Sequence, residues 1–84
     1  MKKVIRINND KEAIKFCNIC MKYKEFLNVN LICGSRIVDG CSIVGVLGMM
    51  LKKCILDIHC SDENVVKDFY DELLFFDDYT EENE

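Results

Sequence analysis

The feature that most constrains the fold of this 84-residue chain is the alternation of two hydrophobic periods along it. Segments in which every second residue is apolar are typical of strands, and segments with apolar residues three or four positions apart are typical of helices. The two patterns predict elements in the order β-α-β-β-α-β-α. Because each strand is apolar on one face and each helix on one stripe, the elements must stack in two layers.

Four segments show the strand period, at residues 2–8, 28–33, 36–38 and 54–60. Gly34 and Ser35 predict a tight turn that joins the middle two strands into a hairpin. The apolar residues of each strand are expected to face the core. The opposite face of the sheet is then expected to carry Arg6, Asn28, Asn30, Asp57 and His59.

Three segments show the helix period. In the first, Asn9 is the predicted N-cap and Glu12 completes a capping box. Its apolar stripe consists of Ala13, Phe16, Cys17 and Cys20. The second helix is short and follows Ser42, and the third begins at Ser61 or Asp62 and extends to about Phe76. The stripe of the third helix consists of Val66, Phe69, Tyr70, Leu73 and Leu74.

We therefore predict an α+β fold, an open-faced two-layer β-sandwich with a four-stranded, mostly antiparallel sheet and the helices on one face. A chain of this length forms one domain, which we place at residues 1–77. Residues 62–84 carry one Lys against ten Asp or Glu. Residues 78–84 are accordingly expected to form an acidic, flexible tail.

Composition argues against several functional classes. Residues 1–61 carry ten Lys or Arg against five Asp or Glu, a bias well short of a nucleic-acid-binding footprint. No apolar run approaches the ~20 residues of a membrane span, and the N-terminal MKKVIRINN lacks the apolar region of a signal peptide. We expect a cytoplasmic protein whose partners include neither nucleic acid nor membrane.

The CNIC motif at residues 17–20 has two interpretations. Metal-binding and redox-active cysteines usually lie in loops or at helix starts, where thiolates are accessible. Cys17 and Cys20 instead fall on the core stripe of a helix, and the chain's six cysteines are interspersed with aliphatic residues. The pattern favours buried small hydrophobes in a reducing compartment, with no metal and no cofactor. A thiol or metal-binding protein remains the alternative.

Two further patterns suggest chemistry that their surroundings do not support. His59, the only histidine, shares a strand face with Asp57, but no pocket-forming loop is evident beside it. Gly45 and Gly48 lack the spacing and the following Lys-Ser/Thr of a phosphate-binding loop. We expect His59 to be an ordinary surface residue and the glycines to allow close packing on the sheet.

Ser42 is the strongest candidate for a functional residue. It precedes the apolar run IVGVLGMM as a predicted N-cap. A phosphate added there would meet backbone N–H groups and the positive end of the helix dipole. Ile43, Val44 and Leu47 cannot all face inward on so short a helix, so part of this surface is expected to meet a partner.

Two stretches, NLICGSRIVDGCSIVGVLGMM and CILDIHCSDENVVKDFYDEL, resemble the HPr family, the histidine-containing phosphocarriers of the bacterial sugar phosphotransferase system. The family has the same βαββαβα order, a central VNLKSIMGVMSL motif and a last helix opened by DEN. The resemblance places Ser42 on the regulatory serine that HPr kinase/phosphorylase modifies. It places Ile43, Val44 and Leu47 on the patch that docks enzyme I, sugar-specific enzymes and transcriptional regulators.

The chain departs from the family at the phosphocarrier site. The family histidine lies in a GIHARPA loop, whereas this chain has NDKEAIKF, with Glu12 or Lys11 in the histidine's place. Cys41 also replaces the lysine before the regulatory serine. The resemblance therefore predicts a non-catalytic, cytoplasmic binding protein of the phosphotransferase system. An active phosphocarrier that uses His59 or another acceptor is the second alternative.

Overall fold

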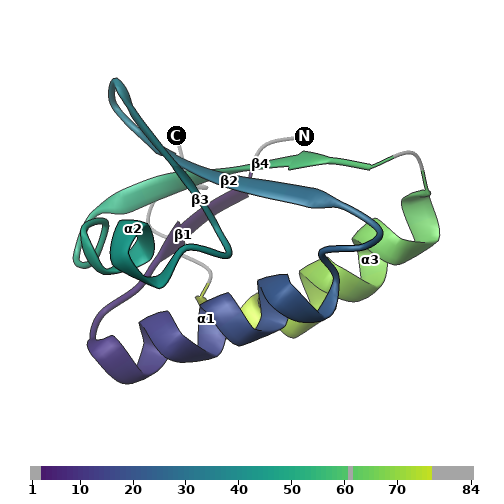
Figure 1. Ribbon diagram of the computed structural model, residues 1–84, viewed down its shortest axis with the longest axis horizontal. Coiled ribbons are helices and arrows are strands. Elements are labelled where there is room, and N and C mark those ends of the chain that lie inside the picture. The colour runs from purple at the N-terminus through teal and green to yellow at the C-terminus, as the bar shows by residue number, and fades with distance from the viewer. Residues whose placement is uncertain (1–2, 61, 77–84) are drawn as a thin grey trace.

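The computed structural model describes residues 3–60 and 62–76 and confirms an α+β fold with the predicted element order. The elements are β1 (Lys3–Arg6), α1 (Asp10–Lys22), β2 (Asn28–Cys33), β3 (Arg36–Asp39), α2 (Ile43–Leu47), β4 (Lys53–His59), α3 (Glu63–Glu72) and the 3₁₀ turn η1 (Leu74–Phe76). The predicted boundary between the domain and its acidic tail lies outside the described residues. Figure 1 shows α1 and α3 side by side beneath the sheet, which is the arrangement of an open-faced sandwich.

The four strands form one sheet in the order β1-β4-β2-β3, and every neighbouring pair is antiparallel. Gly34 joins β2 to β3 with a φ of 61°, a left-handed conformation that glycine adopts without steric cost. Opposite residues in antiparallel strands point to the same face. Leu31 lies opposite Leu56, and Ile5 opposite Cys54. All four are buried, so this face carries the core.

The other sheet face carries the polar residues that the sequence predicts. Asn28 lies opposite His59, and Asn30 opposite Asp57. The same face also holds an aliphatic row that the prediction did not include. The register aligns Val4 with Ile55, Ile55 with Ile32, and Ile32 with Ile37 across all four strands. The uncovered face is therefore polar at one end and aliphatic in the middle.

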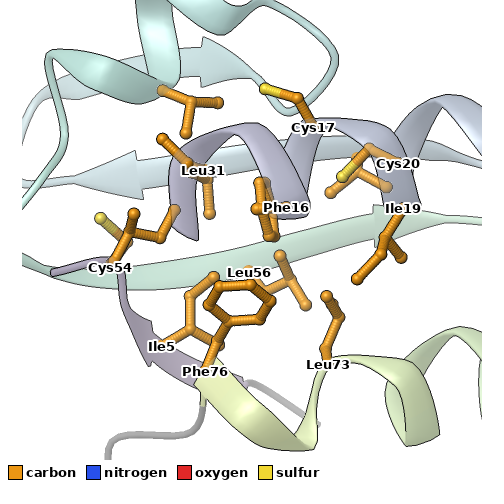
Figure 2. Close-up of a cluster of buried hydrophobic side chains, with 14 of the residues drawn as sticks. Ile5, Phe16, Cys17, Ile19, Cys20, Leu31, Cys54, Leu56, Leu73 and Phe76 are labelled. Atoms are coloured by element: carbon orange, nitrogen blue, oxygen red, sulfur yellow. The ribbon is translucent and has the colours of Figure 1, made fainter. Parts of the chain in front are cut away.

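Helix α1 begins and packs as its sequence predicts. The Asn9 side chain accepts a hydrogen bond from the Glu12 N–H at 2.9 Å, and the Glu12 carboxylate accepts one from the Asn8 N–H at 2.9 Å. These two bonds satisfy backbone groups that the helix start leaves unpaired. The buried stripe is Ala13, Phe16, Cys17, Ile19 and Cys20. Figure 2 shows Phe16 against Phe76, with ring centroids 5.7 Å apart and planes at 84°.

The third helix starts where expected and ends earlier. Asp62 is the N-cap, because its carboxylate accepts a hydrogen bond from the Asn64 N–H at 2.9 Å; Ser61 lies outside the described residues. The α-helix ends at Glu72, and the chain continues as η1. The tighter 3₁₀ turn changes the side-chain spacing. As a result Phe76 is buried while Leu74 is 53% exposed, so the predicted placement of Leu74 on the apolar stripe is wrong.

Candidate functional site

Helix α2 is a single short turn of helix whose start is fixed by two side chains. The Ser42 hydroxyl, at the N-cap, accepts a hydrogen bond from the Gly45 N–H at 3.3 Å. In the segment just before Ser42, the Asp39 carboxylate accepts a hydrogen bond from the Cys41 N–H at 2.9 Å. Ser42 is exposed. Its hydroxyl therefore caps the helix at a position that an enzyme can reach.

Glycines let α2 lie close to strand β3. A Cβ built on Gly45 would stand 3.0 Å from the Val38 Cβ, and one built on Gly48 would stand 3.2 Å from the Arg36 Nη2. The Val38 Cβ would have to shift to make room, whereas the end of the flexible Arg36 side chain can move away. Gly45 thus serves close helix–sheet packing, and Val46 is fully buried beneath the helix.

The remaining apolar residues of α2 face outward. The exposed fractions are 37% for Ile43, 78% for Val44 and 37% for Leu47. We call these three residues the α2 patch. The structure therefore brings the predicted partner-binding residues together on one exposed helix that begins immediately after Ser42.

Sequence reasoning missed Leu51, which lies in the loop after α2 and is 64% exposed. Its φ is 67°, a left-handed conformation that is unfavourable for a branched side chain. The Leu51 N–H donates to the Ile7 carbonyl at 2.7 Å, and this bond holds the strained turn. No local sequence signal indicates such a conformation, because glycine or asparagine is the usual residue there.

Lys11 and Glu12, one of which the sequence resemblance aligns with a phosphocarrier histidine, both lie in the first turn of α1. Glu12 is committed to the start of α1, since its carboxylate accepts the Asn8 N–H. Lys11 lies exposed in the same turn of the helix. The structure thus gives Glu12 a capping role that explains a carboxylate at this position.

His59 and Asp57 form the hydrogen-bonded pair that their spacing suggests. The His59 Nε2 lies 2.9 Å from an Asp57 carboxylate oxygen, and both side chains are substantially exposed. No pocket-forming loop is evident beside His59 in the sequence, but the structure has a cleft there. His59 and Asn28 help to line a cleft of about 530 Å³. It forms because the chain leaves the sheet after Asp39, a long-range feature that local patterns do not reveal.

The cysteines of the CNIC motif are core residues. Cys17 is 5% exposed and Cys20 fully buried, and Figure 2 shows both on α1 among the core side chains. Burial raises the pKa of the Cys17 thiol to about 11, and burial likewise raises the pKa of Cys20. Both thiols therefore stay protonated at neutral pH, which opposes metal binding and nucleophilic reactivity.

The other four cysteines differ in burial: Cys54 is buried, and Cys33, Cys41 and Cys60 are partly exposed. All six cysteines lie in the described part of the chain, and none is in a disulfide. Within residues 3–60 and 62–76, no cluster of three or more His, Cys, Asp or Glu side chains is arranged to hold a metal ion. The same residues include no helix long and apolar enough to cross a membrane.

Comparison of the chain with protein-family models, with curated proteins and with solved structures gives no match.

Proposed function

We propose that this protein is a non-catalytic, HPr-like binding protein that docks partners through the α2 patch, with Ser42 as a phosphorylation site at the edge of the patch. The observation that carries the proposal is the pairing of an exposed N-cap serine with three exposed apolar residues on the helix that follows it. An apolar surface that the fold leaves uncovered is typical of a protein–protein contact.

The proposal draws its partners from the sequence resemblance. The observed element order and the antiparallel sheet are compatible with an HPr-like sandwich. By that resemblance the partners are enzyme I, the sugar-specific enzymes or a transcriptional regulator, together with an HPr kinase/phosphorylase. The absence of an imidazole at Glu12 supports a binding role in place of phosphoryl transfer from phosphoenolpyruvate.

Phosphorylation of Ser42 would change the patch by charge. A phosphoserine carries about −1.5 to −2 charges at pH 7. Placed immediately before Ile43, that charge would oppose the burial of the patch in an apolar interface and favour a partner with a basic rim. Ser42 would then select between partners without a change of fold.

The test is to incubate the protein with ATP, Mg²⁺ and an HPr kinase/phosphorylase and to weigh the intact chain. The proposal expects a gain of one phosphoryl group that is absent from Ser42→Ala. Thr80→Ala is the matched control, because it removes another hydroxyl and should leave the gain unchanged. No gain, or a gain that persists in Ser42→Ala, would reject Ser42 as the switch.

A second candidate function, phosphocarrier activity through His59, rests on the His59–Asp57 pair, which could orient an imidazole. Phosphoenolpyruvate with enzyme I would then give an acid-labile adduct that His59→Gln abolishes. The binding-protein proposal expects no adduct. The two functions are therefore separated by one mass measurement on each variant.

A further inference from the structure

The cleft beside His59 lies on the molecule where strand β3 has ended and strand β2 continues. The Gly40 N–H donates to the Val29 carbonyl at 2.9 Å, after which the chain turns away toward Cys41. Pairing between β2 and β3 covers β2 only from Asn30 onward. The neighbouring edge at Asn28 is left open, and Lys24 reaches the same space from the loop after α1.

The cleft has the volume of a small-molecule site, and its lining is more polar than that of most such sites. Its volume of about 530 Å³ falls within the usual range of roughly 300–1,000 Å³ for ligand pockets. Six residues with polar side chains line it: Lys24, Asn28, Asn30, Asp39, Cys41 and His59. Two buried aliphatic side chains, Leu27 and Val29, complete the lining.

Much of the hydrogen-bonding capacity of these side chains is unused. Among the described residues, the Lys24 ammonium and the side-chain amides of Asn28 and Asn30 have no hydrogen-bond or ion-pair partner. The Asp39 carboxylate uses one oxygen for the Cys41 N–H. His59 uses one ring nitrogen for Asp57 and keeps the other. Hydrogen-bond donors and hydrogen-bond acceptors thus line the same cleft.

The charges in the cleft narrow the class of ligand. Lys24 is positive and Asp39 negative, and both line the cleft together with Cys41. Burial raises the pKa of Cys41, Asp39 raises it further, and Lys24 lowers it. A purely anionic ligand would meet Asp39, and a purely cationic one would meet Lys24. A ligand that carries both charges can satisfy both residues, and amide groups on the same face suit its remaining polar atoms.

We propose that this cleft binds a small zwitterion of the amino-acid class, with its carboxylate on Lys24, its ammonium on Asp39 and further hydrogen bonds to Asn28 and Asn30. The proposal does not depend on docking through the α2 patch. The α2 patch is apolar and exposed, whereas the cleft is hollowed and polar.

The test is a titration of the ¹⁵N-labelled full chain with each standard amino acid at millimolar concentration, followed by amide chemical shifts. At least one amino acid should shift the amides of Asn28, Asn30, Asp39 and Cys41 in a saturable way. The hydroxy acid and the amine that correspond to this amino acid, each lacking one of the two charges, should bind at least tenfold more weakly.

Two variants and one control complete the experiment. Lys24→Met and Asp39→Asn should each weaken binding about tenfold or more, because each variant loses one charge-assisted hydrogen bond to the ligand. Lys11→Met, which removes an exposed lysine outside the cleft, should bind as the wild type does. Because Lys24 is exposed, its variant should fold even if Asp39→Asn does not. No saturable shift with any amino acid, equal binding of the singly charged analogues, or unchanged binding by Lys24→Met would overturn the proposal.

Discussion

Helices α1 and α2 pack against each other but bury different shares of their apolar residues, although α1 also exposes Ile14 and Met21. Helix α1 spans 13 residues and buries five of them, including Phe16 and Cys20. Helix α2 spans five residues and buries only Val46. Its other large apolar residues, the α2 patch, remain exposed.

The difference separates residues that specify the fold from residues that are available for function. The apolar stripe of α1 is fully accounted for by the core, because each of its members belongs to the buried core cluster. The α2 patch contributes little to the core. An exposed apolar cluster outside the buried core suggests another constraint, and binding a partner is the one we propose.

Removing one large side chain from each helix should show the difference between α1 and α2 most clearly. Phe16→Ala deletes a fully buried ring that contacts Phe76 and should cost about 3–5 kcal/mol of unfolding free energy. Val44→Ala, in the patch, should change it by less than about 0.5 kcal/mol. Urea unfolding followed by circular dichroism measures both. Similar losses in the two variants would mean that the patch is part of the core.

The close packing of α2 against β3 should give the next largest change in unfolding free energy. Gly45→Ala places a Cβ 3.0 Å from the Val38 Cβ and should cost about 1–3 kcal/mol despite the better helix propensity of alanine. Val44→Ala changes the adjacent, exposed position and serves as control in the same urea experiment. A Gly45→Ala protein that is as stable as the wild type would show that α2 can move away from β3 at no cost.

Removal of the N-cap side chain of either helix should lower the unfolding free energy by a smaller amount. Loss of an N-cap side chain typically costs 0.5–2 kcal/mol, about 1 on average. Asn9→Ala breaks a 2.9 Å bond at the start of α1, and Ser42→Ala breaks a 3.3 Å bond at the start of a much shorter helix. We expect Asn9→Ala to be the more destabilising in urea. The reverse order would mean that Ser42 is principally a structural residue.

Stability should also respond to alkaline pH through Cys17 in α1 and Tyr23 at its C-cap. Burial raises the pKa of Cys17 from 9.0 to about 11, and a hydrogen bond to Glu72 raises the pKa of Tyr23 from 10.0 to about 12. A group whose pKa is higher in the folded state holds its proton there while the unfolded chain releases it. Its contribution to stability is complete below the unfolded pKa and is lost as pH rises through the folded one.

The urea midpoint should therefore fall from about pH 9 upward, and it should fall less steeply between pH 10 and 12 in Tyr23→Phe. The contribution of Glu72 to stability has the opposite pH dependence, because the hydrogen bonds from Tyr23 and Lys22 lower the pKa of Glu72. Its contribution is present above the unfolded pKa and is lost in acid. An alkaline profile that is identical in the wild type and Tyr23→Phe would contradict the shifted Tyr23.

Local patterns predict most of the fold here because local chemistry determines it. The cap at Asn9, the stripe through Phe16 and the turn at Gly34 each depend on a few neighbouring residues. The errors arise where distant segments meet. Leu74 turns outward because the last helix gives way to a 3₁₀ turn that buries Phe76.

Contacts between distant segments also account for the features of the two candidate sites that local sequence patterns do not predict. Ser42 and the patch follow from helix length and spacing, so the sequence predicts their exposure. The cleft joins Lys24, Asp39 and His59 from three segments of the chain, and only the order of the strands brings them together. The strained turn at Leu51 similarly depends on a long-range bond to Ile7.

We propose that the α2 patch serves binding and not folding. Calorimetric titration of purified enzyme I and HPr kinase/phosphorylase with wild type and Val44→Glu tests it most directly, with urea unfolding of both proteins alongside. The account predicts that the wild type binds at least one of them and that Val44→Glu binds at least tenfold more weakly, with unfolding free energies within about 0.5 kcal/mol of each other. Equal binding by the two proteins, or no binding of the wild type to either enzyme, would contradict it.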